Sequence, residues 1–118
     1  MIQSKSLQRA TLIGTVLQLA MVIAGHFSPW VAQHVFMFGG MAISALAGLL
    51  YGNAARRGYG GGALGGAIVG GVCALIGIAV SVVLGDTAAV ILAIGTVSSA
   101  VTGAIGGLVG QAVPRAAS

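Results

Sequence analysis

The amino-acid sequence predicts an all-α integral membrane protein, a four-helix transmembrane bundle with glycine-zipper packing. Three observations lead to this fold class. The chain is 58% hydrophobic with only 5% charged residues, its apolar residues form four long runs, and small residues recur at every fourth position. Soluble domains carry about a quarter charged residues. We therefore assign residues 1–118 to a single transmembrane domain.

The apolar runs define the expected membrane spans. They cover residues 7–26, 29–52, 60–85 and 87–112. Each contains about 20–26 residues, which makes about 30–39 Å of helix against about 30 Å of hydrocarbon. Because only short segments join the runs, consecutive helices are expected to be antiparallel neighbours.

The first run also has features of a signal peptide. Lys5 and Arg9 lie at its start, like the basic region of a signal peptide. Val22-Ile23-Ala24 near its end resembles the small-residue site at which such a peptide is cleaved. We favour a retained helix, because the run is long for the apolar part of such a peptide and three more spans follow it.

All the basic side chains fall on one side of the predicted bundle. Two lie just before or in the first turn of the first span, two separate the second from the third, and one follows the fourth: Lys5, Arg9, Arg56, Arg57 and Arg115. Cytoplasmic loops of membrane proteins carry an excess of Lys and Arg. We therefore expect both termini to be cytoplasmic and the protein to lie in a bacterial inner membrane. So strong a bias argues against a dimer of oppositely inserted copies.

Small residues at four-residue spacing predict the helix faces that pack. Such residues share one face of a helix and let a neighbouring helix approach backbone to backbone in a bilayer. The predicted packing residues are Gly40, Ser44, Gly48, Gly62, Gly66, Gly70, Gly95, Ser99, Gly103 and Gly107. The pattern fits packing within one compact bundle and also contacts between copies, and both interpretations remain open at this point.

Polar side chains in the first and fourth spans form a second pattern. Hydroxyl and amide groups that converge in a bundle can line a path for water, an ion or a small solute. The residues of this possible path are Thr11, Thr15, Gln18, Thr96 and Thr102. The same groups also serve structure, because Ser and Thr often bond a carbonyl one turn back and a glutamine can bridge two helices.

Several functional classes find no support in the sequence. No Asp, Glu, Lys or Arg lies well inside a predicted span, whereas coupled transporters usually need an embedded ionisable residue. His26 and His34 have no Cys, Asp or Glu close by in the sequence and are too few for a metal site. Cys73 has no neighbouring base that would activate it. We expect no catalytic residues, metal or cofactor, and no nucleic-acid partner, because the basic residues form no stripe.

Two functions from different classes fit these patterns. We favour a non-catalytic membrane subunit that acts by helix–helix assembly, as a homo-oligomer or as an accessory subunit of a membrane complex, because small-residue faces are abundant. The alternative is an oligomeric pore or facilitator for a small solute or ion, with a holin-like pore as a subtype. It rests on the hydroxyl-bearing faces of the first and fourth spans. The expected partners are the lipid bilayer and other membrane-embedded chains.

Overall fold

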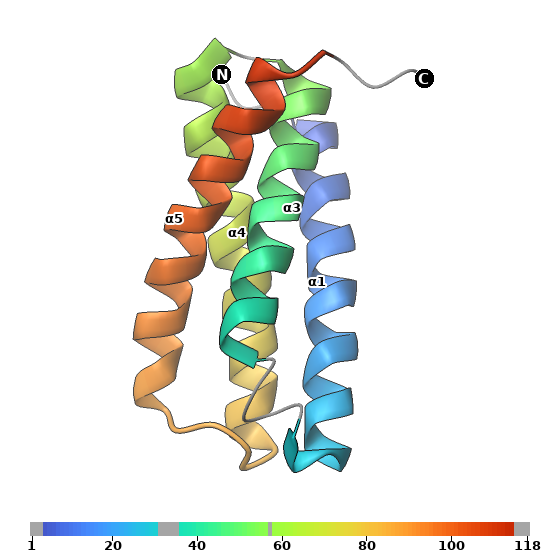
Figure 1. Cartoon of the computed structure of the whole chain (residues 1–118), viewed down its shortest axis with the longest axis vertical. Helices are drawn as coiled ribbons and strands as arrows, with labels where there is room; N and C mark the ends of the chain where they lie inside the picture. Colours follow the sequence, from blue (N-terminus) through green and yellow to red (C-terminus); the bar gives the residue numbers. More distant parts are fainter. Residues whose placement is uncertain (1–3, 31–35, 57, 115–118) are drawn as a thin grey trace.

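The computed structural model describes residues 4–30, 36–56 and 58–114. Its four long helices are α1 (Ser4–Phe27), α3 (Phe36–Ala55), α4 (Gly58–Val83) and α5 (Val90–Ala112). They alternate in direction, so α1 begins and α5 ends at the same end of the molecule (Figure 1). Each helix is long and apolar enough to cross a membrane. The expectation of an all-α, multi-pass membrane protein is thus confirmed.

The bounds of all four helices differ from the expected spans. α1 begins three residues early, at Ser4, and ends one residue late, at Phe27. α3 continues to Ala55 rather than ending at Gly52, and α4 begins and ends two residues early, at Gly58 and Val83. Pro29 and Trp30 are helical, but the rest of the predicted start of the second span, residues 31–35, lies outside the described residues.

α5 begins at Val90, three residues later than expected, for a local reason. Gly85 adopts a positive φ of 82°, and the Asp86 amide donates to the Ser81 carbonyl at 3.0 Å, which closes α4 with a Schellman-type turn. Thr87, the expected first residue of the fourth span, hydrogen-bonds Ser81 side chain to side chain at 2.6 Å. Its hydroxyl is therefore committed to the end of α4.

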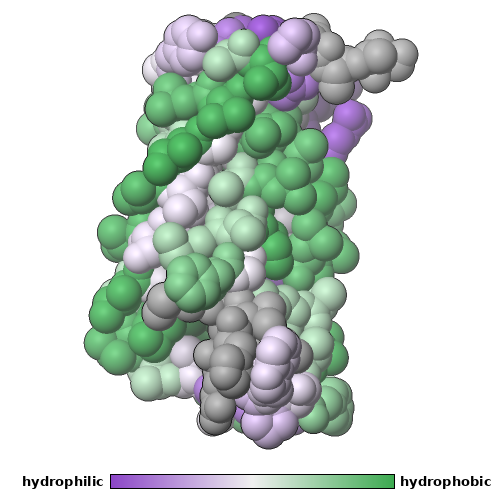
Figure 2. All heavy atoms as spheres, viewed as in Figure 1, coloured by the Kyte–Doolittle hydropathy of each residue, from purple (hydrophilic) through white to green (hydrophobic). Residues whose placement is uncertain are grey.

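The helices are arranged with α3 and α4 in the middle. These two helices pack against each other, and α1 and α5 each pack against both of them from opposite sides (Figure 1). Among the described residues, no Cα atom of α1 lies within 8 Å of one in α5. The buried side chains at the centre are small, with Tyr51 the largest. Hydrophobic residues cover the flanks, and hydrophilic residues gather at the two ends (Figure 2), as expected for a protein surrounded by lipid.

Glycines bring α5 into backbone contact with α4 and α3. A Cβ on Gly66 would overlap the carbonyl oxygen of Gly103, and a Cβ on Gly62 would lie 2.8 Å from that of Gly107. The same close approach to a backbone oxygen occurs at Gly48, Gly52, Gly70, Gly106 and Gly110. These small residues therefore already have partners inside one chain, where the absence of a side chain permits the contact.

Asn53, near the end of α3, and Arg56, just after it, bond backbone carbonyls at the carboxyl end of α5. The Arg56 guanidinium donates from Nη1 to the Val113 carbonyl at 3.0 Å and from Nη2 to the Gln111 carbonyl at 3.1 Å. Asn53 Nδ2 donates to the Pro114 carbonyl at 3.0 Å. A cation stabilises the partial negative charge at the end of a helix. Arg56 thus has a structural role in addition to the topological role that the sequence predicts.

Candidate binding cavity

A polar cluster lies at the centre of the bundle, where three helices meet. Gln18 of α1 is only 2% exposed. Its Nε2 donates to the Gly40 carbonyl at 3.1 Å and to Ser44 Oγ at 3.3 Å, both on α3, and contacts Cys73 Sγ of α4 at 3.9 Å. Ser44 Oγ in turn donates to the Gly70 carbonyl at 3.2 Å. The cluster thus ties α1, α3 and α4 together in a region otherwise filled by small apolar groups.

The Gln18 amide has only one consistent orientation. A backbone carbonyl is purely an acceptor, so the nitrogen must face Gly40. Oε1 is then the other atom of the amide. It lies 3.5 Å from the position of a Cβ built on Gly40 and 3.6 Å from that of a Cβ built on Gly77. No described residue donates a hydrogen bond to this oxygen. The largely buried Gln18 side chain therefore presents an acceptor oxygen for which no described residue is a donor.

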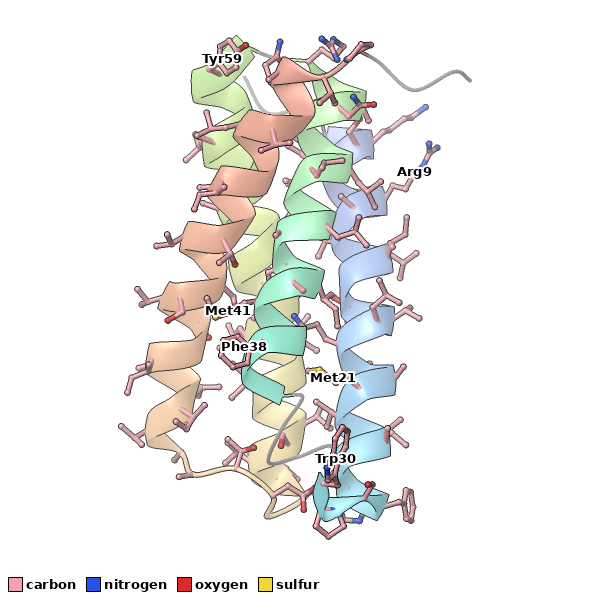
Figure 3. The ribbon with its side chains drawn as sticks, in the orientation of Figure 1. Arg9, Met21, Trp30, Phe38, Met41 and Tyr59 are labelled. Atoms are coloured by element: carbon pink, nitrogen blue, oxygen red, sulfur yellow. The ribbon has the colours of Figure 1, made fainter. Side chains whose placement is uncertain are left out.

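Gln18 lines a cavity of about 400 Å³ between the four helices. The walls are mainly apolar and come from all four helices and the α4–α5 loop: Met21, Val22, Met41, Ala74, Gly77, Ile78, Ala88, Ile91, Ile94 and Gly95. Met21 and Met41 lie in the half of the bundle away from Arg9 and Tyr59 (Figure 3). The cavity therefore occupies the half that the basic residues do not.

Ser99 and Ser98 of α5 add hydroxyl groups to the cavity lining. Ser99 is 3% exposed. A Cβ on Gly70 would lie 2.6 Å from the Ser99 carbonyl oxygen, and Gly70 also accepts the bond from Ser44. Ser99 and the Gln18 cluster are therefore at about the same depth, at the inner end of the cavity.

The loop between α4 and α5 forms the other end of the cavity. Asp86 lines it, and its Oδ2 lies 2.8 Å from Nδ1 of His26 at the end of α1. His26 has no carboxylate close by in the sequence, but folding brings Asp86, 60 positions away, within hydrogen-bond distance of it. The pair fastens the loop to α1 at the edge of the cavity.

The opposite half of the bundle is closed. Beyond Gly70 and Ser99, the backbone contacts at Gly66–Gly103 and Gly62–Gly107 join α4 directly to α5. Contacts of the same kind join α5 to α3. The cavity therefore ends near the middle of the helices within a single chain.

The residues of the predicted polar path occupy separate places. Thr11 and Thr15 line a shallow groove of about 490 Å³ between α1 and α4. Thr102 Oγ1 donates to the Ser99 carbonyl of its own helix at 3.0 Å. Thr15 and Thr96 have buried hydroxyls without a partner in the described part of the chain. Of the five residues, only Gln18 lines the main cavity, and no described Cα atom of α1 lies within 8 Å of one in α5.

Two of the predicted packing residues make ordinary or side-chain contacts instead of backbone contacts. A Cβ on Gly40 would lie 3.5 Å from Gln18 Oε1, an ordinary van der Waals distance, and a Cβ on Gly95 would lie 2.5 Å from Ile78 Cδ1, which can move. Both glycines line the cavity. At these two positions the small residue leaves space rather than permitting a helix crossing.

The described residues contain no group of three His, Cys, Asp or Glu placed to hold a metal ion. No protein-family model, curated protein or solved structure matches the chain. The class of protein therefore follows from the fold and the site: a multi-pass α-helical membrane protein with a cavity that is closed at one end.

Proposed function

We propose that this is a non-catalytic membrane protein that holds a small, largely apolar molecule in the cavity between its four helices. The observation that carries the proposal is a cavity of about 400 Å³ whose lining includes Gln18, with an acceptor oxygen for which no described residue is a donor. Ligand pockets are typically 300–1,000 Å³ in volume and mainly apolar, with a few convergent polar groups. An empty space of this size would forfeit dispersion contacts along all its walls.

Binding fits the geometry better than conduction does. A pore through one chain would need to continue past Gly70 and Ser99, where the backbones of α4 and α5 are in contact. The pore alternative therefore requires a passage between chains. Retention of a molecule in a cavity with one closed end requires only the chain described here.

A photoreactive alkyl diazirine tests the proposal. We expect the probe to label cavity-lining residues of the protein in lipid nanodiscs, and Ser98→Phe to lower this labelling at least about fivefold, because Ser98 lines the cavity and a phenyl ring would fill it. The matched control is Val97→Phe, on the adjacent residue, which is 65% exposed and faces away. Peptide mass spectrometry locates the label. Labelling confined to lipid-facing residues, or equal effects of the two variants, would contradict the proposal.

We extend the proposal to orientation, with both termini and the α3–α4 loop on the cytoplasmic side of a bacterial inner membrane. The end of the cavity lined by Asp86 then lies toward the opposite side. In a Cys73→Ser background, we expect an impermeant maleimide to label Ala88→Cys in intact cells. Tyr59→Cys should react only after permeabilisation. Both positions are exposed, so the reversed labelling pattern would overturn the orientation.

Assembly with other chains is the second candidate function. The observation that favours it is the groove between α1 and α4, where Gln8 and Thr11 lie beside exposed apolar side chains such as Leu12. In hydrocarbon, hydroxyl groups tend to hydrogen-bond across helices. The glycine faces support this candidate less, because so many of them contact α5 or its neighbours within the chain.

The intact particle mass distinguishes assembly from a single chain. If the groove is an interface, gentle extraction yields a particle heavier than one 11.5 kDa chain, and Thr15→Leu shifts it toward the single-chain mass. Val101→Leu on α5, where Val101 is 56% exposed, serves as the control. A single-chain mass for the wild type would exclude assembly, whereas identical masses for the two variants would exclude this groove.

A further inference from the structure

We infer that the cavity selects neutral, elongated apolar molecules that carry one terminal hydroxyl group, the chemistry of a medium-chain alcohol. This inference rests on the proposed function and goes further by naming the class of ligand. It is carried by the two hydrogen-bonding groups at the inner end of the cavity, by the absence of free charge in the described lining, and by the length of the apolar walls.

The polar groups at the inner end match a hydroxyl. Gln18 Nε2 is committed to Gly40 and Ser44, so Oε1 remains as an acceptor for which no described residue is a donor. Ser99 Oγ lines the same cavity and can donate or accept. A ligand hydroxyl can donate to Oε1 and accept from a serine at the same depth. A purely apolar ligand would cover Oε1 without giving it a donor, which is costly in a low-dielectric region.

The electrostatics of the lining favour a neutral ligand. In the part of the chain that the structure describes, Asp86 is the one charged residue in the lining, and His26 already faces it at 2.8 Å. An ammonium or carboxylate group near Gln18 would have no counter-charge there, and burying an unpaired charge in apolar surroundings is strongly unfavourable. A hydroxyl has no such cost.

The length and shape of the walls favour an elongated apolar body. His26, which pairs with Asp86 at the other end of the cavity, lies eight residues beyond Gln18 on α1, a rise of about 12 Å. The walls between these levels include Met21, Met41 and Ile78. Methionine adapts its shape to flexible apolar groups. Ser81 and Thr87 also line the cavity, but their hydroxyls bond each other. Water alone would therefore find few partners along the apolar walls, because an ordered water needs two to four.

Competition against the alkyl diazirine tests the inference on the wild-type protein. The competitors are 1-octanol, its methyl ether and n-octane, compared at equal concentrations in the nanodisc lipid phase. The ether keeps the oxygen but lacks the O–H donor. We expect 1-octanol to halve cavity labelling at a concentration about fivefold lower than the ether or the alkane, the effect of about one net hydrogen bond.

A Gln18→Met variant tests whether Gln18 recognises the hydroxyl. We expect the advantage of 1-octanol over n-octane to fall below about twofold, while n-octane still competes as in the wild type. Continued competition by n-octane shows that the cavity persists. If the variant loses the cavity altogether, hydroxyl selection is judged from the wild-type comparison of 1-octanol with its methyl ether.

The outcomes separate this inference from the proposed function. Equal competition by all three compounds in the wild type would overturn hydroxyl selection and leave small-molecule binding intact. An unchanged preference for 1-octanol in a Gln18→Met variant that retains its cavity would overturn the role of Gln18. Absence of cavity labelling, with no effect of any competitor, would overturn the proposed function and this inference together.

Discussion

Replacing Gly66 by alanine is expected to destabilise the bundle by about 1–3 kcal/mol, the usual cost of overpacking. The new methyl group would overlap the carbonyl oxygen of Gly103 on α5. Since this neighbour is backbone, the clash is relieved only if α4 and α5 move apart, and their other close contacts then loosen as well. The measurement is the free energy of unfolding in mixed micelles of mild detergent and dodecyl sulfate.

Gly60→Ala is the matched control on the same helix. No described atom lies within 4 Å of a Cβ at Gly60, so the substitution should be neutral or stabilise α4 by up to about 1 kcal/mol through helix propensity. A second clash variant, Gly107→Ala, places its methyl against the Gly62 carbonyl oxygen and should behave like Gly66→Ala. Equal effects at Gly60 and Gly66 would show that the α4–α5 contact is looser than described.

The contacts of Gly66 and Gly70 within the chain also determine which variant can test assembly. A leucine at Gly66 or Gly70 is expected from the sequence alone to disrupt contacts between chains. In the structure both residues face α5 of the same chain, so such a variant would unfold the bundle whether or not the protein assembles. Thr15→Leu, on the groove between α1 and α4, is the more selective variant.

The sequence was sufficient to predict the helices because long apolar runs leave the backbone no alternative in hydrocarbon. It was less informative about their ends. Gly85 is a recognisable helix terminator, but the late start of α5 depends on the hydroxyl of Thr87 bonding Ser81. That bond depends on how the turn folds back on α4, which residue spacing alone does not reveal.

The candidate site was only partly predictable. Gln18 stood out as the largest polar side chain deep in a span, yet its partners on α3 and α4 depend on which helices are neighbours. Four antiparallel helices can be arranged so that α1 touches α5, and the expected polar path assumed such convergence. The pairing of His26 with Asp86 had no local signal, because it joins the ends of two connections far apart in the sequence.

The bundle divides into two halves with different packing. Toward the basic residues, glycines let three backbones meet, and little space remains for a ligand. Toward Asp86, cavity-lining glycines such as Gly40 and Gly95 leave space between side chains. Gln18 lies at the boundary, so it stabilises the contact of three helices and also forms the end of the cavity.

Gln18→Leu is therefore expected to destabilise the protein even without a ligand, by about 1–2 kcal/mol. Leucine is similar in size but leaves the Gly40 carbonyl and Ser44 Oγ without their donor. Hydrogen bonds between transmembrane helices contribute about 0.6 kcal/mol on average and up to about 1.7 kcal/mol, and this amide makes two to oxygen acceptors. Unfolding in mixed micelles measures the change.

Gln8→Leu makes the same substitution on the same helix, ten residues earlier, at an exposed position that lines the α1–α4 groove. It should change the unfolding free energy by less than about 0.5 kcal/mol. Ser44→Ala completes a double-mutant cycle with Gln18→Leu, and a coupling energy above about 0.5 kcal/mol is expected for residues in one network. Additive effects, together with equal costs at Gln8 and Gln18, would mean that the polar cluster does not hold the three helices together. The cavity would then end at a side chain that is free to turn, and the acceptor on which ligand selection depends would not be fixed in place.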